Sequence, residues 1–300
     1  MDRIAGSPHT ILNSVHPLRR RSVRQCHKLT SGAILGREPE ASEPHGGHGP
    51  ADTMDRGMSL AYKHRVLSER VLRTLRARDD SQGELGRPLM IGIAGMPGSG
   101  KSTTADIVCR LVNDADPSLC ALVLPMDGFH YSRKELDEFE DPEEAHRRRG
   151  APHTFDGEAF VRTIATLRRN GCENWPAFDH GVGDPVQGAI TITRENRIIF
   201  VEGLYLYLEC TPWCLTHGML DDCWYLRTTV DVAMSRVRRR HMSLGHTELV
   251  ADHRIATNDR INAEIVSADA KKDIDLRLRN FPPAPRVIDL VIDADEHMNI

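Results

Sequence analysis

A glycine-rich segment carries the most specific chemical signal in the chain, Gly95-Met96-Pro97-Gly98-Ser99-Gly100-Lys101-Ser102. Its pattern is G-x-x-x-x-G-K-S, and it lies between an apolar run at 89–94 and a helical pattern at 103–114. Glycines let the backbone wrap around phosphate oxygens with its N–H groups directed inward, and the helix that follows adds the positive end of its dipole. The strand–loop–helix setting therefore predicts a site for the phosphates of a nucleotide.

Two side chains of this loop have distinct expected tasks. Lys101 should reach the β- and γ-phosphates, and Ser102 should ligate Mg²⁺. The chain lacks both the Asn-Lys-x-Asp guanine-reading motif of regulatory GTPases and the Ser-Gly-Gly-Gln signature of transporters. ATP and Mg²⁺ are the predicted cofactors, and the residues expected to bind ATP are Gly95, Pro97, Gly98, Ser99, Gly100, Lys101, Ser102 and Thr103.

Two acids follow predicted strands. The strand expected at 121–126 runs into Asp127-Gly128, and the strand expected at 197–201 runs into Glu202-Gly203. Ligands of open parallel sheets bind beyond the carboxyl ends of the strands, so both acids are expected beside the phosphate loop. Phosphoryl transfer needs one carboxylate to accept the proton of the acceptor hydroxyl and another to hold Mg²⁺ or its waters. Either acid alone could simply end a strand, but the pair beside such a loop favours the functional interpretation.

Four arginines cluster on a predicted helix at 230–243. Arg236, Arg239 and Arg240 share one helix face, whereas Arg238 points elsewhere. A solvated charged face is the usual outcome of such a run. A lid helix that closes on ATP would instead use the shared face to neutralise charge on the transferred phosphoryl group. We expect a lid over about 236–258, with Arg236 and Arg240 as its catalytic arginines.

The elements that must position these residues follow from hydrophobic periodicity. Apolar residues at helical spacing predict a helix over 60–78, and Asn258 and Asp259 are expected to be N-cap residues of a helix. Strands alternate with helices, which predicts an α/β fold with a parallel central sheet between helices. Together with the phosphate loop and the expected helical lid, this gives a fold of the three-layer P-loop type. The expected strands are 89–94, 121–126, 197–201, 223–226 and 287–292, and the further helices are 103–114, 157–170, 230–243 and 246–268.

The motifs together resemble those of a known superfamily. Gly95–Thr103, Met126–His130 and Val201–Leu204 are similar to segments of the phosphoribulokinase, uridine kinase and pantothenate kinase superfamily of P-loop kinases. The resemblance covers about residues 60–295 and is strongest for the YFH7/YggC-like branch. It implies that Asp127 is the general base toward an acceptor hydroxyl and that Glu202 acts on Mg²⁺ through water. The other segments that fit are Arg148–Asp156, Pro176–His180 with Asp184-Pro185, Arg236–His241 and Asn258–Ala263.

The acceptor site is less well specified. Asp156, Asp179 and His180 are candidate substrate-binding residues, because carboxylates and an imidazole suit several hydroxyls. Asp179-His180 departs from the Tyr-Asp-Phe form common in uridine kinases, which argues against a pyrimidine nucleoside. Phe178 is expected either to line the pocket, together with Phe129 and Tyr131, or to pack in the core. Arg148 and Arg149 either bind an anionic substrate or cap the acidic segment 135–144; Arg149 is counted among the substrate-binding candidates.

Composition limits the classes of partner. A formal net charge of −4 and a pI near 6.4 argue against a protein that coats nucleic acid. No apolar run approaches the roughly 18 residues of a membrane span, so no membrane partner is expected. Seven cysteines, an odd number, favour a reducing compartment. Cys210, Cys214, His217 and Cys223 raise the question of zinc, but they read better as ordinary helix and loop residues.

Residues 1–57 differ from the rest of the chain. Their basic, acid-poor start and the breaker-rich run at 42–50 are compatible with a mitochondrial transit peptide, a disordered tail or an upstream extension. We favour a tail and a cytoplasmic protein, with mitochondria as the alternative if residues 1–30 are a transit peptide. The kinase domain is expected at 58–300, and a homodimer remains open.

The expected function is ATP- and Mg²⁺-dependent phosphorylation of a hydroxyl group on a small metabolite. Sugars, nucleosides and pantothenate-like alcohols all remain candidates for the acceptor. One alternative is a nucleotide-dependent switch or ATPase that acts on a protein partner. A catalytically silent binding protein is a second alternative, and the presence of Lys101, Ser102, Asp127 and Glu202 together argues against it.

Overall fold

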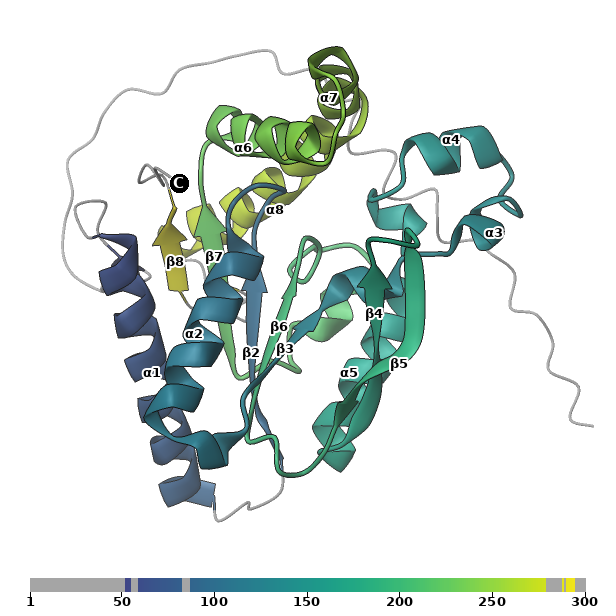
Figure 1. The fold of residues 1–300 in the computed structure, drawn as a ribbon. Coiled ribbons are helices and arrows are strands. Elements are labelled where there is room, and N and C mark those ends of the chain that lie inside the picture. Colours follow the sequence, from purple (N-terminus) through teal and green to yellow (C-terminus); the bar gives the residue numbers. More distant parts are fainter. Residues whose placement is uncertain (1–51, 55–58, 83–86, 279–287, 289, 295–300) are drawn as a thin grey trace, which may run out of the picture. The chain divides into compact units, whose positions relative to one another are not determined.

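Six strands form the central sheet of the computed structural model, in the order β1-β8-β7-β2-β6-β3 (Figure 1). Every neighbouring pair is parallel. The structure describes residues 52–54, 59–82, 87–278, 288 and 290–294, and all of them belong to one unit of the chain. The strands are β1 (Asp52–Met54), β2 (Leu89–Ala94), β3 (Leu122–Pro125), β6 (Ile198–Gly203), β7 (Asp222–Arg227) and β8 (Leu290–Asp293).

Helices cover both faces of this sheet. The helices α1 (Leu60–Gln82) and α2 (Lys101–Ala115) lie side by side on one face (Figure 1). The other face packs against α5 (Gly157–Asn170), α6 (Val230–Ser243) and α8 (Arg260–Leu278). Because successive strand residues point to opposite faces, each strand contributes to both cores. Ile91 and Ile93 pack toward α1 and α2, for example, whereas Met90 belongs to the core on the other face.

The predicted α/β architecture is confirmed. The helices at 157–170 and 230–243 have the predicted bounds, and the predicted strands are displaced at their ends by three residues or fewer. Strand β1 lies inside the segment expected to be an N-terminal extension, and it pairs with β8. The rest of residues 1–57, apart from Asp52–Met54, lies outside the described residues. No helix in the part of the chain that the structure describes is long and apolar enough to cross a membrane.

The helix predicted over 246–268 is interrupted. It consists of α7 (Glu248–Arg254), a π-helical turn (Ile255–Asp259) and the first half of α8. The interpretation of Asn258 and Asp259 as N-cap residues is therefore wrong, because both lie within continuous helical backbone. A π-helical turn holds one extra residue, so it changes the direction in which the neighbouring side chains point.

The sequence pattern did not predict a two-stranded antiparallel hairpin beside the sheet. It is formed by β4 (Glu173–Asp179) and β5 (Asp184–Ile192), and Trp175 fastens it to β3 by donating an indole N–H to the carbonyl oxygen of Pro125 at 2.9 Å. The short helices α3 (Arg133–Leu136) and α4 (Pro142–Arg147) were also not predicted. Prolines, glycines and exposed positions in β4 and β5 obscure the alternation by which strands are recognised.

Candidate active site

The predicted phosphate loop joins β2 to α2. Gly98 and Gly100 have φ angles of +78° and +92°, which residues with side chains rarely adopt. A Cβ at Gly98 would lie 2.4 Å from the carbonyl oxygen of Ala233, so α6 approaches the loop closely. The hydroxyl of Ser99 is buried and has no hydrogen-bond partner among the described residues. A tight loop with an unused buried hydroxyl fits the cradle that phosphate oxygens require.

Glu202 lies beside the start of α2. It follows Ile198 and Phe200 on the face of β6 that packs against α2, and its strand neighbours are Ile93 and Pro125. The Ser102 hydroxyl lies near the Glu202 carboxyl group and affects its pKa. The Oε2 atom of Glu202 is buried without a partner among the described residues. Glu202 is the penultimate residue of β6 and therefore does not follow the strand as predicted. The structure brings together the two residues predicted to hold Mg²⁺.

The carboxyl group of Glu202 is electrostatically unusual. Burial raises its pKa to about 7, Lys101 opposes this rise, and the negative charge of Asp127 adds to it. The nearby Ser102 hydroxyl also favours the ionised form. A carboxyl group whose ionisation is held back by burial becomes a much better ligand when a cation arrives to compensate its charge. The unsatisfied Oε2 atom and the Ser102 hydroxyl thus fit Mg²⁺ bound to a nucleotide.

Asp127 lies in a short 3₁₀ turn (Met126–Phe129) directly after β3. A Cβ at Gly128 would lie 2.0 Å from the carbonyl oxygen of Pro176, so the glycine is required by the close approach of β4. The hairpin therefore packs directly against the turn that carries Asp127, the predicted general base.

His130 belongs to the Met126–His130 motif but was not among the predicted site residues. Its Nδ1 atom lies 2.8 Å from the carbonyl oxygen of Asp127, which can only accept, so Nδ1 carries the proton and Nε2 is left as an acceptor. Burial lowers the pKa of His130 and keeps the ring neutral. The ring lies 3.8 Å from Phe155 and 5.0 Å from Phe178, between centroids. In the sequence, the feature that could have identified His130 as a site residue is its position directly after Asp-Gly-Phe.

The hairpin brings several predicted acceptor residues into one region. Phe178 lies next to His130, and the guanidinium carbon of Arg149 is 5.4 Å from the centre of the Phe178 ring. Arg149 donates to the carbonyl oxygens of Tyr131 and Gly183 and to the carboxylate of Asp184, at 2.6 to 2.8 Å. Its buried Nε atom has no hydrogen-bond partner among the described residues. Arg149 therefore stabilises the hairpin and keeps one donor unused.

Two of the other acceptor candidates, Asp156 and Asp179, are engaged with backbone. Asp156 caps α5 by accepting the N–H of Ala159 at 2.8 Å. Asp179 accepts the N–H groups of Gly181 and Val182 within the hairpin turn. The exposed ring of His180 lies 5.2 Å from that of Phe178. Substrate binding by Arg149, Asp156, Phe178, Asp179 and His180 remains a prediction.

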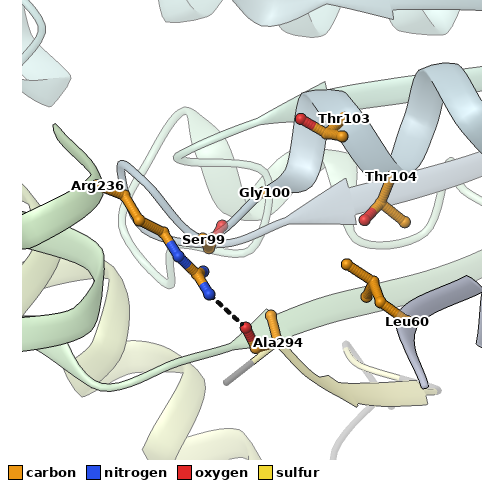
Figure 2. Close-up of a pocket in the computed structure, with 7 residues that line it drawn as sticks. All are labelled: Leu60, Ser99, Gly100, Thr103, Thr104, Arg236 and Ala294. Atoms are coloured by element: carbon orange, nitrogen blue, oxygen red, sulfur yellow. Dashed lines mark hydrogen bonds between the residues drawn. The ribbon is translucent and has the colours of Figure 1, made fainter. Parts of the chain in front are cut away.

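The arginines of α6 divide into distinct environments. Arg236 donates to the carbonyl oxygens of Gly98 at 3.3 Å and Ala294 at 2.8 Å, and so links α6, the phosphate loop and the end of β8 (Figure 2). Arg238 points away from it and forms ion pairs with Glu248 and Asp252 of α7. Arg240 is exposed. The catalytic roles of Arg236 and Arg240 stay predictions.

Arg148 is the C-cap residue of α4, directly after the acidic segment 135–144, which agrees with the capping alternative. It donates to the side-chain oxygens of Asn258 and Asn262, both at 3.1 Å, while Asn258 donates to the carbonyl oxygen of Arg149 at 2.8 Å. The π-helical turn directs Asn258 toward this segment. The next residue, Asp259, pairs with His241 of α6 at 2.9 Å. The turn thus connects the acceptor region to the helix that carries Arg236.

Within the described ranges, no group of three or more His, Cys, Asp or Glu side chains is arranged to hold a metal ion. Mg²⁺ in nucleotide sites usually keeps several waters and takes only one or two protein ligands besides phosphate oxygens. Ser102 and Glu202 supply such a set.

Comparisons with known proteins identify the family. No protein-family model matches the chain. A proposed uridine kinase of Schizosaccharomyces pombe, C227.14, is 41% identical over 182 residues, which cover 59% of this chain and 77% of that protein. The ATP-dependent kinase-like protein notR' of Aspergillus versicolor is 37% identical over 146 residues, which cover 46% and 85%. The chain belongs to the phosphoribulokinase/uridine kinase superfamily of P-loop kinases.

Further relatives agree with this assignment to the P-loop kinases. The ATP-dependent kinase YFH7 of Zygosaccharomyces rouxii is 32% identical over 189 residues; the chain spans about half the length of that protein (50%). A proposed fructose transport system kinase from Silicibacter sp. TM1040 superposes with a TM-score of 0.62 at 28% identity, covering 78% of this chain and 99% of that one. YFH7 from Saccharomyces cerevisiae gives 0.63 at 20% identity with the same coverage, and so supports the fold. The predicted superfamily and fold are confirmed.

Proposed function

We propose that this P-loop kinase transfers the γ-phosphoryl group of ATP to a hydroxyl group of a small molecule, such as a sugar, a nucleoside or a pantothenate-like alcohol. The observation that carries the proposal is the pair of acids at one edge of the sheet. Glu202 is buried against Ser102 and Lys101 of the phosphate loop, and Asp127 is close enough to raise the pKa of Glu202. Two carboxylates with different environments beside a phosphate loop suit two different tasks in phosphoryl transfer.

The phosphate-binding half of the site holds the donor. The backbone N–H groups around Gly98 and Gly100, the ammonium of Lys101 and the start of α2 all direct positive charge toward the same region. Ser102 and Glu202 would hold Mg²⁺. When bound, Mg²⁺ neutralises charge on the phosphate oxygens. Glu202 contributes by keeping a carboxyl oxygen, Oε2, that no other side chain of the described residues uses.

The other half of the site receives the acceptor. Asp127 is exposed enough to reach a hydroxyl group and accepts its proton as the oxygen attacks the γ-phosphorus. The Nε2 atom of His130 can accept a hydrogen bond from a second hydroxyl group, and Phe178 offers an aromatic surface against the carbon skeleton. The unused Nε–H of Arg149 is a further donor. These groups suit a small polyhydroxylated molecule better than a charged macromolecule.

An ADP-release screen across a library of metabolites with hydroxyl groups tests the proposal. ATP and Mg²⁺ are supplied throughout, and Asp127→Asn protein serves as the blank for every compound. We expect at least one compound class to give ADP release that requires Asp127, with a phosphate monoester as the second product. If no compound exceeds the blank and a protein partner stimulates ATP hydrolysis instead, the alternative of a nucleotide-dependent switch replaces the kinase.

A further inference from the structure

A small pocket adjoins the phosphate loop on the side of α1 and the end of β8 (Figure 2). Asp127, His130, Arg149 and Phe178 do not line it, so it is separate from the half of the site assigned to the acceptor. Its wall combines the loop, the first turn of α2, one arginine of α6 and two apolar residues from distant parts of the chain. The residues that line it are Leu60, Ser99, Gly100, Thr103, Thr104, Arg236 and Ala294.

Helix α1 lies before the phosphate loop in the sequence, yet its first turn contributes a residue to this pocket. Leu60, Lys63 and His64 have the i, i+3, i+4 spacing that places side chains on one helix face. Lys63 is completely buried, and its Nζ atom donates to the carbonyl oxygen of Asp293 at 3.0 Å. His64 is 4% exposed, and its Nε2 atom lies 3.3 Å from the Thr104 hydroxyl. Two buried hydrogen bonds thus hold Leu60 in place.

Lys63 and His64 lose their contact with water at these positions and are compensated by their hydrogen bonds. Burying a lysine removes its ammonium group from water, and burial also lowers the pKa of His64 and keeps that ring neutral. The hydrogen-bond partner of Lys63, Asp293, lies at the end of β8. The partner of His64, Thr104, lies in α2, two residues after Ser102. The first turn of α1 is therefore tied to the two elements between which the pocket lies.

The chemistry of the pocket suits the nucleoside part of a nucleotide. Leu60 and Ala294 supply apolar surface, and the Thr103 hydroxyl lies on the helix that begins with Lys101. The guanidinium group of Arg236 is held by two carbonyl oxygens, so a planar cation is presented in a fixed orientation. Planar guanidinium groups stack well on aromatic rings, and an aliphatic side chain packs against the rest of a base or a ribose.

We infer that the first turn of α1 is part of the nucleotide site, where Leu60 packs against the nucleoside of the donor and is positioned by Lys63 and His64. This inference rests on the proposed function, because it requires the phosphates to occupy the loop. It assigns to α1 a role in binding the donor that the phosphate-loop motif does not include. It also separates two contributions to affinity, one from the phosphates and one from the nucleoside.

Isothermal titration calorimetry with two probes separates these contributions. Both are magnesium complexes, one of the ATP analogue AMPPNP and one of inorganic tripolyphosphate, which has the phosphates but no nucleoside. Replacing Leu60 by Ala should weaken AMPPNP binding about three- to tenfold, because part of a leucine side chain no longer contacts the ligand. Tripolyphosphate binding should stay within twofold of the wild type, which also shows that the loop is folded. Leu60→Met, which keeps the volume, should restore AMPPNP binding to within about twofold.

Leu72→Ala is the matched control, because Leu72 lies on the same helix and is partly buried but does not line the pocket. It should leave the binding of both probes unchanged. The inference is overturned if Leu60→Ala leaves AMPPNP binding unchanged, or if it weakens both probes equally. If the wild-type protein binds neither probe, the proposed function itself fails, and the inference fails with it.

Discussion

Glu202 makes the stability of the nucleotide-free protein depend on pH in a direction that can be measured. Its pKa is raised from 4.5 to about 7, first by burial and then by Asp127, against the opposing effect of Lys101. The folded state therefore holds a proton that the unfolded state releases. The stabilisation that results is complete below about pH 4.5 and is lost as the pH rises through about 7.

The size of this effect follows from the same pKa values. A tenfold change in proton affinity corresponds to about 1.4 kcal/mol, so the difference of about 2.5 between 4.5 and about 7 sets an upper limit of about 3 kcal/mol. Local relaxation around the ionised carboxyl group reduces this figure, and we expect about 1–3 kcal/mol between pH 5 and pH 8.5. For a domain of this size, each kcal/mol shifts the melting temperature by about 2–4 °C.

Glu202→Gln is the perturbation that isolates the effect, because glutamine has nearly the same shape and does not ionise. Without nucleotide or Mg²⁺, the melting temperature of the variant relative to the wild type should rise by about 2–10 °C between pH 5 and pH 8.5. Differential scanning fluorimetry at several pH values measures this. Glu264→Gln, which changes an exposed carboxyl group on α8, should show no such trend.

The reasoning is refuted if the difference in melting temperature between wild type and Glu202→Gln is the same at pH 5 and pH 8.5. The same variant should lose most of the stabilisation that Mg²⁺ and ATP give to the wild-type protein, because the Mg²⁺ ligand has gone. A variant that is more stable alone but less stabilised by its ligands would show that the buried acid is retained for function at a cost in stability.

The remaining predictions concern the acceptor side. Asp127→Asn should lower kcat about 10²- to 10⁴-fold and leave the calorimetric affinity for Mg²⁺ and AMPPNP within twofold; an unchanged kcat would rule out the general base. Gly128→Ala should destabilise the protein by about 1–3 kcal/mol in urea unfolding, because a carbonyl oxygen of β4 is 2.0 Å from the added Cβ. The control Gly218→Ala has open space around its Cβ and should not destabilise the protein; equal effects of the two changes would contradict the close approach. In a double-mutant cycle, Arg148→Ala and Asn258→Ala should be non-additive by about 0.5–3 kcal/mol, and additivity would mean that their hydrogen bond does not couple the two segments.

Sequence alone was sufficient where the signal is local. The phosphate loop has positive φ at Gly98 and Gly100; the motif names Gly100 directly, whereas Gly98 stands at one of its variable positions. The helices at 157–170 and 230–243 have the bounds predicted from the sequence pattern, and the structure adds that Asp156 and Thr229 cap their N-termini. Asp127 follows one apolar strand and Glu202 lies near the end of another, and short apolar runs of this kind are typical of a buried parallel sheet.

Tertiary structure decided everything that depends on contacts between distant residues. The approach of β4 makes Gly128 necessary, and burial against α2 holds a proton on Glu202 near neutral pH. Arg148 and Asn258, 110 residues apart, determine each other's position through a π-helical turn that no local pattern indicated. Leu60 reaches the pocket only because α1 packs against α2. The sequence by itself determined where ATP is expected to bind. The packing of distant segments decided the protonation of Glu202 and the side chains that surround Asp127, because both depend on residues that meet only in the folded chain.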